Sequence, residues 1–382
     1  SGSTGKPKGV MVPHQGLLNL LNSMSRQPGL TAEDRLVAVT TMSFDMSIPE
    51  LFLPLVVGAR VIVASRDDAR DGESLRRLLE TTGATMMQAT PSGWRVLLDS
   101  GWRGHRGFKA LAGGEAVPQD LAQALIERCG EVWNMYGPTE TTVWSTCCRL
   151  QTFERGVSIG TPIDNTSVWI LDANLQPCPV GVSGEIWIGG DGVTLGYLNR
   201  PELTAERFIA DPFSEREGAR LYRTGDRGRW RNDGRLEHLG RLDFQVKVRG
   251  YRIELGEIEA SLAAHPSAER AVVITREDRP GDVRLVGYVV PRAPAATAEA
   301  LRDFLRQTLP GYMVPQYILD IPSVPLTPNG KIDRKALPVP DASSAVSSAD
   351  RVAPRTETEA EILAAMEEVL SLPGLGIRDD FF

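Results

Sequence analysis

The stretch SLRRLLETTGATMMQAT, residues 74–90, places an amphipathic helix directly before a strand. Its leucines recur at helical spacing, and Gly83 is a typical helix stop. The run that follows, residues 84–90, is strand-like. The same alternation extends in both directions along the chain. Helices that alternate with strands in this way predict an α/β layer with parallel strands over residues 10–135.

Further along the chain the pattern changes twice. Short strand-like runs separated by Gly, Pro and Asp fill residues 157–240 and predict a second sheet or a barrel-like unit. Residues 244–266, FQVKVRGYRIELGEIEASLAAHP, then open a small α+β unit, with a hairpin between 271–275 and 284–290 and a helix over 300–309. Such a unit is long enough to fold by itself.

The segment after residue 340 has a different composition. Ser, Ala and Asp dominate residues 341–350, which is typical of a linker. Thr356 and Glu359 then predict a capping box at the start of a final helix. The predicted organisation is a large core subdomain over 1–242, a small C-terminal subdomain over 243–340, a linker over 341–353 and the start of a further domain over 354–382.

The overall composition is that of an ordinary soluble protein, with 382 residues, 42% of them hydrophobic and 24% charged. The net charge of −7, without any basic block, argues against nucleic acid as a partner. The four cysteines lack a metal-binding spacing and are expected to be reduced thiols in a cytoplasmic protein. No apolar run is long enough to span a membrane. Because the chain lacks an initiator methionine, we expect a piece of a longer protein.

The first ten residues, SGSTGKPKGV, have the composition of a phosphate-binding loop. Glycine allows the backbone to approach an anion closely, and consecutive N–H groups can form an anion-binding concavity. Hydroxyl donors and positive charge come from Ser3, Thr4, Lys6 and Lys8. Pro7 excludes the common nucleoside-triphosphate loop, which needs Ser or Thr after its lysine. Taken alone, the composition leaves a solvated polar turn equally open.

Nucleophilic and metal chemistry find little support in the sequence. The histidines at positions 14, 105, 238 and 265 have no partner at a suggestive spacing, so each is expected in a structural or surface role. What remains is an ordered series of dense polar motifs. These are SFDMSIPE (43–50), LAGGEAVP (111–118), NMYGPTETTVW (134–144), YRTGD (222–226), GRLDFQVKVRGYRIELGEIE (240–259), LPGYMVP (309–315) and NGKIDRKAL (329–337).

In this order the motifs strongly resemble the adenylation domains of nonribosomal peptide synthetases. These domains belong to the adenylate-forming family, with acyl-CoA synthetases and luciferases. The resemblance covers almost the whole chain. It implies an α/β fold with a large multilayer domain whose N-terminal part is missing here, a β-barrel-like subdomain and a small α+β C-terminal lid domain. The tail over 354–382 resembles the beginning of a peptidyl carrier domain.

The resemblance implies a reaction in two steps. The carboxylate of an amino acid attacks the α-phosphorus of ATP, which gives an aminoacyl adenylate and pyrophosphate. The adenylate then passes to the phosphopantetheine thiol of a carrier protein. ATP and Mg²⁺ are the implied cofactors, and synthesis of antibiotics or other secondary metabolites is the implied role. Such catalysis rests on positioning and charge stabilisation, so no nucleophile of the enzyme is needed.

The resemblance also assigns the nucleotide site. The opening loop would face the departing pyrophosphate, Glu140 would supply a hard oxygen ligand for Mg²⁺, and Thr139 would donate to the α-phosphate. Asp226 would accept from the ribose hydroxyls, with Arg241 nearby. The base and ribose would meet Asn134, Tyr136, Gly114, Glu115 and Ala116.

Two further residues belong to the second half of the chain. Lys331 is expected to enter the active site between the substrate carboxylate and the ATP phosphates, and it is the strongest candidate for a catalytic residue. Its alternative is a solvated lysine in an Asn-Gly-Lys turn. Asp243 is expected to be the hinge about which the small subdomain rotates between adenylation and thioester formation.

The substrate pocket carried over from the family motifs consists of Asp45, Met46, Pro49, Gln88, Leu111, Gly113, Met135, Val143, Trp144 and Lys331. The Asp45 carboxylate can pair with a substrate α-ammonium group, which favours an α-amino acid over an aryl or fatty acid. The bulky side chains argue against a long or charged substrate. The pattern resembles pockets for glycine first, and then for alanine or serine-like acids, whose hydroxyl Gln88 could bond.

Two other functions stay open from the sequence alone. The first is an acyl- or aryl-CoA synthetase of the same family, which would leave Asp45 without an amine to bind. The second is a non-catalytic docking module, which would not need Lys331, Asp226 or Glu140. The resemblance implies a carrier domain as partner. It also allows an upstream condensation-type domain and a small MbtH-like accessory protein.

Overall fold

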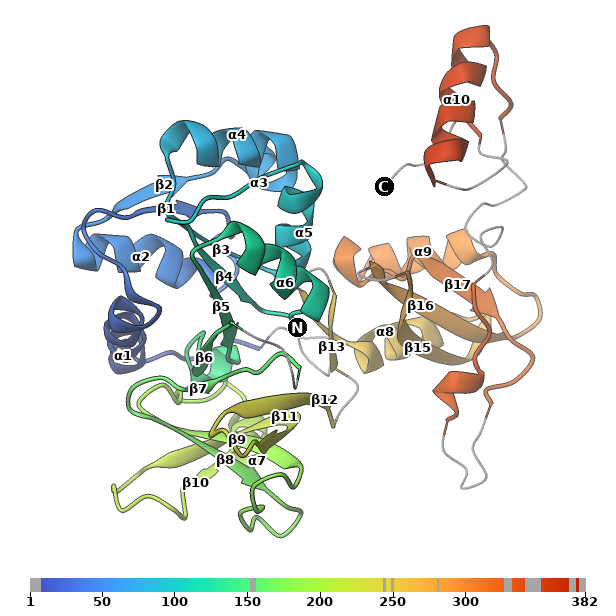
Figure 1. The fold of residues 1–382 in the computed structure, drawn as a ribbon. Helices are drawn as coiled ribbons and strands as arrows, with labels where there is room; N and C mark the ends of the chain where they lie inside the picture. Colours follow the sequence, from blue (N-terminus) through green and yellow to red (C-terminus); the bar gives the residue numbers. More distant parts are fainter. Residues whose placement is uncertain are drawn as a thin grey trace. The chain divides into compact units, whose positions relative to one another are not determined.

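The computed structural model describes residues 8–151, 156–242, 245–248, 251–279, 282–325, 332–340, 352–370 and 376–377. The chain divides into two compact units, one within Pro7–Gly250 and the other mainly within Tyr251–Phe382. Both can be followed along the chain in Figure 1.

A seven-stranded sheet forms the centre of the first unit (Figure 1). Its strand order is β2-β1-β3-β4-β5-β6-β7. The first five strands are parallel, and β6 and β7 are antiparallel. The predicted α/β layer is therefore confirmed. The strands are β1 (Arg35–Ala38), β2 (Arg60–Val63), β3 (Met86–Ala89), β4 (Lys109–Gly113), β5 (Glu131–Tyr136), β6 (Thr146–Arg149) and β7 (Thr161–Pro162).

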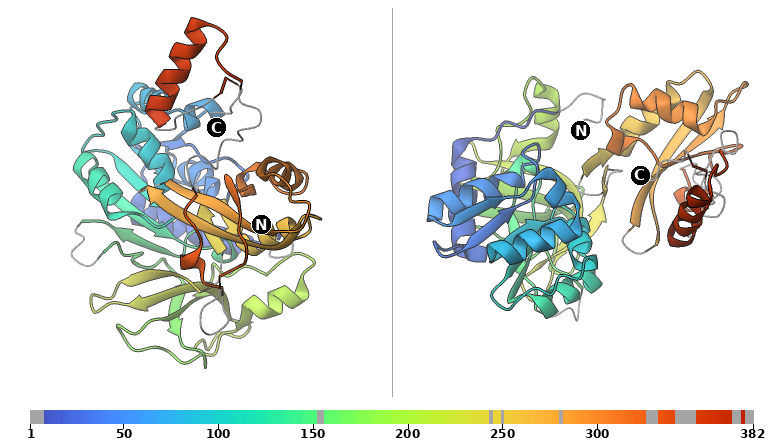
Figure 2. Two further views of the ribbon diagram at one scale, coloured as in Figure 1. Left: turned by 90° about the vertical axis from the view of Figure 1, so that its right-hand side faces the viewer. Right: turned by 90° about the horizontal axis from the view of Figure 1, so that it is seen from above.

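Helices cover both faces of this sheet, as the views in Figure 2 also show. Met86 and Leu111 lie in one core with side chains of α1 and α2, whereas their neighbours Met87 and Ala110 lie in a second core with α4, α5 and α6. This is the period of two expected for a strand buried on both faces. The helices are α1 (His14–Met24), α2 (Ser47–Val57), α3 (Arg66–Arg70), α4 (Gly72–Thr82), α5 (Pro91–Asp99) and α6 (Gln119–Arg128), with a π-helical turn at Ser25–Gly29.

The helix over 72–82 ends at Gly83 as the sequence predicts, and it begins two residues before the predicted start at Ser74. Asp71 caps its N-terminus, since the carboxylate accepts a hydrogen bond from the Ser74 backbone N–H. Gly83 ends it with φ +60°, a left-handed conformation that favours glycine. The chain therefore turns at once into β3, which lies between β1 and β4.

A five-stranded antiparallel sheet forms the rest of the first unit. Its order is β10-β11-β9-β8, and β12 also pairs with β11. The long strand β11 thus pairs with β10 along one part of its edge and with β12 along the next part of the same edge. The elements are β8 (Thr166–Leu171), β9 (Gly184–Gly190), α7 (Pro201–Arg207), β10 (Phe208–Ala210), β11 (Arg220–Trp230) and β12 (Leu236–Arg241), with β13 (Gln245–Val248) at the end of the unit.

The second unit is a small α+β layer, as predicted. Strands β15 and β16 form the expected antiparallel hairpin, and β17 joins β16 in parallel. Helices α8 and α9 pack with this sheet. The elements are β14 (Tyr251–Glu254), α8 (Leu255–Ala263), β15 (Ala268–Arg279), β16 (Asp282–Pro291), α9 (Ala298–Arg306), β17 (Tyr317–Asp320) and α10 (Glu357–Leu370), with 3₁₀ turns at Gly311–Met313 and Arg334–Ala336.

The capping box predicted before α10 is half formed. The Glu359 backbone N–H donates to Thr356 Oγ1, as expected. The Glu359 carboxylate, however, accepts from the backbone N–H of Arg355 at 2.6 Å and from the Arg355 guanidinium. The return bond therefore goes to Arg355, because its positive charge adds to the attraction of its N–H group.

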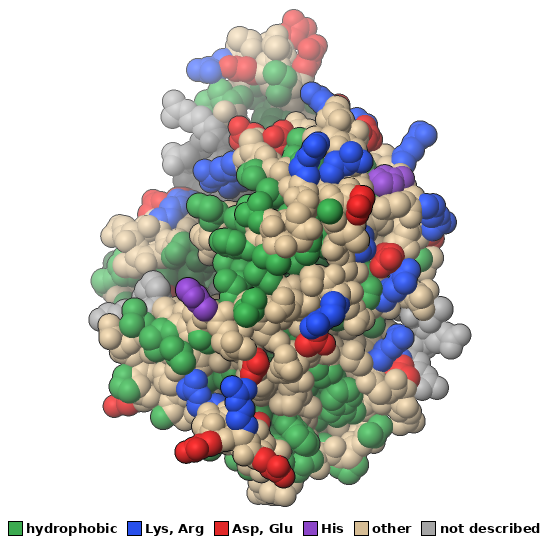
Figure 3. Space-filling model, turned by 90° about the vertical axis from the view of Figure 1, so that its left-hand side faces the viewer, with side chains coloured by type: hydrophobic (Ala, Val, Ile, Leu, Met, Phe, Trp, Pro, Cys, Tyr) green, Lys and Arg blue, Asp and Glu red, His purple; other side chains and the backbone are tan. Residues whose placement is uncertain are grey.

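Hydrophobic side chains gather on the side of the first unit seen in Figure 3, where α1 and α2 lie. On α2 the exposed ones are Phe52, Leu55 and Val56. Within the described residues, none of the helices combines the length and the apolar composition that a membrane span requires. All four cysteines are free thiols, three of them buried and Cys178 half-buried.

Candidate active site

Asp226, on β11, is the centre of a buried polar cluster. Its carboxylate accepts a hydrogen bond from the Tyr136 hydroxyl, and the Oη and Oδ2 atoms are 2.6 Å apart. The same carboxylate forms an ion pair with Arg241, whose Nη1 atom lies 2.9 Å from Oδ1. His238 Nε2 lies 3.4 Å from the same Oδ1 atom. The cluster thus joins β5, β11 and β12 at one point.

The surroundings of Asp226 keep its carboxylate ionised. Burial by itself would raise the pKa of Asp226. The hydrogen bond from His238 and the charge of Arg241 outweigh burial, so the pKa lies well below its usual range. Burial and the neighbouring Asp226 charge raise the pKa of Tyr136 well above its ordinary value, so its phenol stays a hydrogen-bond donor. An ionised carboxylate with two oxygens retains capacity to accept from further hydroxyls.

His238 has a partner, Asp226, that its spacing in the sequence does not indicate. Pairing of β11 with β12 sets Asp226 opposite Arg241 and Gly228 opposite His238, with a bulge between the two pairs. The bulge brings both side chains to one carboxylate. A signal for this register was present, because the turn at 232–234, Asn-Asp-Gly, is typical of a hairpin between the two strands.

Glu140 lies in a second buried cluster, on the 3₁₀ turn Thr139–Thr141. It is 2% exposed. The Tyr197 hydroxyl donates to its Oε1 atom at 2.8 Å, and the Lys8 ammonium lies 5.9 Å from the centre of the Tyr197 ring. The backbone around Lys8 is fixed by bonds such as Leu198 N–H to Gly9 C=O. The described end of the opening loop therefore reaches the Glu140 cluster.

The backbone after Glu140 is held in an uncommon conformation. Thr142 and Val143 have φ values of +62° and +68°, which are costly for β-branched residues. The Thr142 hydroxyl donates to the Gly192 carbonyl at 2.7 Å, in the interior. Strain of this kind gathers at functional sites, where the surrounding structure maintains it. Here it sets the direction in which Trp144 leaves the turn.

Asp45 connects the two sides of the predicted site. It lies just before α2 and accepts a hydrogen bond from Thr139, with Oγ1 and Oδ2 2.5 Å apart. The family resemblance implies that Asp45 lies in the amino-acid pocket and Thr139 beside the α-phosphate. The structure brings these two side chains into direct contact.

The predicted pocket residues form one buried group. Gln88, on β3, is 1% exposed. Its amide nitrogen donates to the Met46 carbonyl at 2.8 Å, and its oxygen accepts from Trp144 Nε1 at 2.9 Å. A Cβ atom on Gly113 would lie 2.5 Å from Cη2 of Trp144. Buried members of this group are Met46, Pro49, Gln88, Leu111, Gly113, Met135, Val143 and Trp144.

The remaining nucleotide-site candidates lie at the ends of β4 and β5. Asn134 is buried, and its amide nitrogen donates to the Ser158 carbonyl at 2.8 Å. Gly114 follows β4 with φ +84°, and Glu115 accepts from the Ser92 hydroxyl. Ala116 follows in the same loop. The carboxyl ends of neighbouring parallel strands thus hold these groups, the usual ligand edge of an α/β sheet.

Five predicted site residues lie outside the described residues: Ser3, Thr4, Lys6, Asp243 and Lys331. Among the residues that the structure does describe, no group of three or more His, Cys, Asp or Glu side chains could hold a metal ion.

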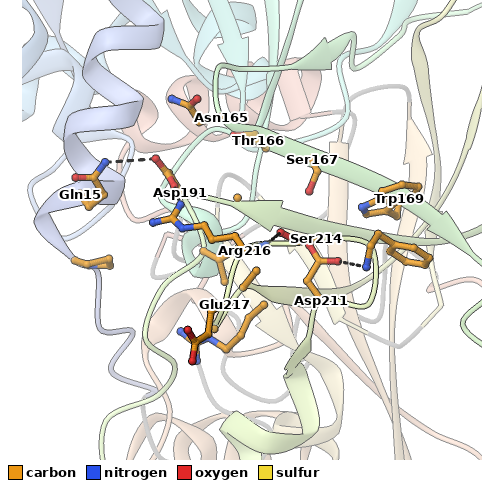
Figure 4. Close-up of a pocket in the computed structure, with 17 residues that line it drawn as sticks. Gln15, Asn165, Thr166, Ser167, Trp169, Asp191, Asp211, Ser214, Arg216 and Glu217 are labelled. Atoms are coloured by element: carbon orange, nitrogen blue, oxygen red, sulfur yellow. Dashed lines mark hydrogen bonds and ion pairs between the residues drawn. The ribbon is translucent and has the colours of Figure 1, made fainter.

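A cavity of about 520 Å³ lies elsewhere in the first unit (Figure 4). Arg216 reaches across it to Asp191, with Nη1 and Oδ1 2.5 Å apart, and Gln15 also contacts Asp191. Trp169 stacks near Phe213, with ring centres 4.2 Å apart. The predicted site residues do not line this cavity.

Two parts of the chain match the family models of AMP-binding enzymes. Residues 1–198 match the family of AMP-binding enzymes, and residues 257–331 match the C-terminal domain of AMP-binding enzymes. The chain belongs to the AMP-binding enzyme family. The boundary between the two matches lies in the region where the structure divides into its two units.

The similar proteins within this family are nonribosomal peptide synthetases. A dimodular nonribosomal peptide synthase of Bacillus subtilis is 51% identical over the whole chain, which spans 16% of that protein. A crystal structure of a four-domain nonribosomal peptide synthetase bound to AMP and glycine is 44% identical, with a TM-score of 0.61, 98% of this chain covered and 28% of that one. A structure with adenylation and PCP domains is 28% identical, with a TM-score of 0.80, and covers 100% of this chain and 63% of that one.

These comparisons confirm the resemblance to nonribosomal peptide synthetase adenylation domains and the class of amino-acid adenylating ligases. They also confirm the adenylate-forming fold. The chain spans only a small part of the curated relatives that it matches.

Proposed function

We propose that this domain activates glycine with ATP for nonribosomal peptide synthesis. The observation that carries the proposal is the packing among the predicted pocket residues, where Trp144 is bonded to Gln88 and lies against Gly113. In the first step a carboxylate oxygen of glycine attacks the α-phosphorus of ATP. The bond from that phosphorus to the bridging oxygen breaks, so that glycyl adenylate forms and pyrophosphate leaves.

Asp45 would bind the substrate α-ammonium group. Its carboxylate now accepts a short hydrogen bond from Thr139. An ammonium group that pairs with Asp45 would compete with this hydroxyl, which could then donate to the α-phosphate. A charge-assisted bond in a desolvated pocket is stronger than a neutral one. An aryl or fatty acid offers no ammonium group to this carboxylate, which disfavours a CoA synthetase of that type.

A substrate side chain larger than a hydrogen atom would meet Trp144, Met46 and Met135, which are all buried. Both amide hydrogens of Gln88 have acceptors within the protein, Met46 O and Glu50 Oε1. This weighs against Gln88 as a donor to a serine hydroxyl and favours glycine. The solved relative bound to AMP and glycine, at 44% identity, supports the same substrate.

The nucleotide would lie between the two buried clusters. The ionised Asp226 would accept from the ribose hydroxyls, and Tyr136 and Arg241 would hold it in place. The opening loop, which ends at Lys8, would offset charge on the departing pyrophosphate. Lys331 would offset the repulsion between the substrate carboxylate and the α-phosphate.

Mg²⁺ fits the site only in part. Glu140 offers a buried carboxylate, a hard oxygen ligand of the kind that Mg²⁺ prefers, and Tyr197 orients it. When bound, the cation would neutralise charge on the phosphates. Because Glu140 is the single protein ligand in this proposal, water and phosphate oxygens would complete the coordination shell.

The second step would transfer the glycyl group to a carrier protein. The phosphopantetheine sulfur attacks the glycyl carbonyl, a thioester bond forms, and AMP leaves. Support comes from the multidomain relatives, one of which contains adenylation and PCP domains. Rotation about Asp243, an upstream condensation-type domain and an MbtH-like accessory protein are part of the same proposal.

Pyrophosphate–ATP exchange on the full-length protein tests this function. The acids offered are glycine, alanine, serine, leucine, benzoate and octanoate, each with Mg²⁺. We expect strong exchange with glycine, weaker exchange with alanine and serine, and background exchange with the rest. Exchange driven by benzoate or octanoate would support the CoA-synthetase alternative, and no exchange with any acid would support a non-catalytic docking module.

A further inference from the structure

Glu50 is a buried carboxylate beneath the predicted pocket that the family motifs do not assign. It lies on α2 and is 1% exposed. Burial of a carboxylate is costly unless hydrogen bonds replace its water. Four donors do so here: the Val39 and Thr40 backbone N–H groups at 2.9 Å each, the Thr40 hydroxyl at 2.5 Å and the amide of Gln88 at 3.0 Å.

The bond to Gln88 fixes which way its amide points. With Glu50 and the Met46 carbonyl both accepting, the Gln88 nitrogen has two acceptors and the oxygen is left to face Trp144. A flipped amide would set its oxygen against both acceptors and its NH₂ group against the indole N–H. That arrangement would leave buried polar groups unsatisfied, at considerable cost.

The Trp144 indole is in turn held from two sides. Its N–H donates to Gln88 at 2.9 Å, and its ring edge lies where a Cβ on Gly113 would clash. The side chain is 1% exposed. A chain of hydrogen bonds therefore runs from the end of β1 through Glu50 and Gln88 to the ring that fills the pocket.

We propose that Glu50 is a positioning residue that selects small amino acids by holding Gln88 and Trp144 in place. Glu50 does not touch the substrate in this role. The proposal rests on the proposed function, because it assigns Trp144 to the floor of the amino-acid pocket. It adds a specificity residue that lies behind the pocket lining.

The test compares Glu50→Gln with wild type in the full-length protein. Pyrophosphate exchange gives kcat/KM for glycine and for alanine, together with KM for ATP. We expect the preference for glycine over alanine to fall by about tenfold, the lower range for one methyl group, with KM for ATP unchanged. Glu80→Gln is the matched control, because Glu80 is exposed on α4 and forms only a surface ion pair with Arg76.

A double-mutant cycle separates positioning from general destabilisation. If Glu50 acts through Gln88, Glu50→Gln should cost no further selectivity in a Gln88→Met background. Additive losses, an unchanged glycine preference in Glu50→Gln, or an equal loss of glycine, alanine and ATP affinity would overturn the proposal. Should Glu50→Gln fail to fold, Thr40→Val replaces it, since it removes the hydroxyl that bonds Glu50 Oε1 and should also relax the preference while leaving the pocket lining unchanged.

Failure of the proposed function gives a different result. Wild type would then prefer another amino acid over glycine. In that case the Glu50 proposal is tested with the ratio of kcat/KM for the preferred amino acid to kcat/KM for its homologue with one more methylene. A relaxed ratio in Glu50→Gln supports the proposal, and an unchanged ratio overturns it.

Discussion

Thr139 donates a hydrogen bond to Asp45, and 2.5 Å separate Thr139 Oγ1 from Asp45 Oδ2. One residue belongs to the turn before β6 and the other to the segment before α2. The contact connects the position proposed for the substrate ammonium group with that proposed for the α-phosphate. In the proposed function, one hydroxyl group would couple binding of the amino acid to the reaction at phosphorus.

Asp45→Asn should impair activation of the amino acid while leaving nucleotide binding intact. The amide keeps the shape of the carboxylate but loses its charge, so we expect kcat/KM for glycine to fall by about 10- to 100-fold. The measurement is pyrophosphate exchange, with ATP affinity followed by calorimetry. Equal activity of wild type and Asp45→Asn would exclude Asp45 as the ammonium partner. Asp99→Asn, at an exposed position on α5, is the control.

Asp226→Asn should impair ATP binding while leaving amino-acid binding intact. The ribose would lose an ionised acceptor, so KM for ATP should rise by about tenfold or more, whereas KM for glycine should change little. Tyr136→Phe removes one hydrogen bond to Asp226 and should have a smaller effect of the same kind. A larger change in KM for glycine than in KM for ATP would contradict the assignment of this cluster to the nucleotide.

Lys331→Ala should reduce adenylation by about 100-fold or more, because a charge that opposes two anions at the reacting phosphorus is lost. ATP affinity should stay close to that of wild type. The matched control is Lys335→Ala, since Lys335 lies in the same motif and is exposed. Near-normal exchange in Lys331→Ala, or an equal loss in both variants, would refute the catalytic role.

Glu50 should make stability depend on pH. Burial raises the pKa of Glu50 from 4.5 to about 7, against the hydrogen bonds from Thr40 and Gln88. Between these two values the folded state retains a proton that the unfolded state has lost, so stability falls as pH rises. The full effect is on the order of 3 kcal/mol.

Unfolding midpoints of wild type and Glu50→Gln between pH 4 and 8 provide the check. The variant has no titratable group at this position, so wild type should lose stability relative to it as pH rises from 4.5 to 7. The difference should then level off. Parallel curves across the whole range would mean that Glu50 has the same pKa in the folded and unfolded states, which would contradict this prediction.

Much of the fold follows from the sequence because its signals are local. The helix over 72–82 carries both an N-cap and a glycine stop, and the alternation of short strands with helices specifies parallel pairing. The second sheet is harder to predict. Its long strand β11 pairs with two different strands along one edge, and strand order of that kind depends on contacts distant in sequence.

In the candidate site, too, some residues could be predicted from the sequence and others could not. Family motifs indicate Asp45, Gln88 and Trp144, and the structure joins Trp144 to Gln88 and Asp45 to Thr139 by hydrogen bonds. The motif over 43–50 contains Glu50 but gives it no role, since a glutamate on a helix is usually solvated. His238 was also missed, because the β-bulge that turns it toward Asp226 depends on strand register.

The kcat/KM ratio of glycine to alanine, for wild type and for Trp144→Ala, tests the central claim most directly. Wild type should prefer glycine by about 10- to 200-fold, the range for one methyl group in a closed pocket. Trp144→Ala should lose or invert that preference, because the ring that fills the pocket is gone. A wild-type preference for alanine, or a glycine preference that survives Trp144→Ala, would contradict the account.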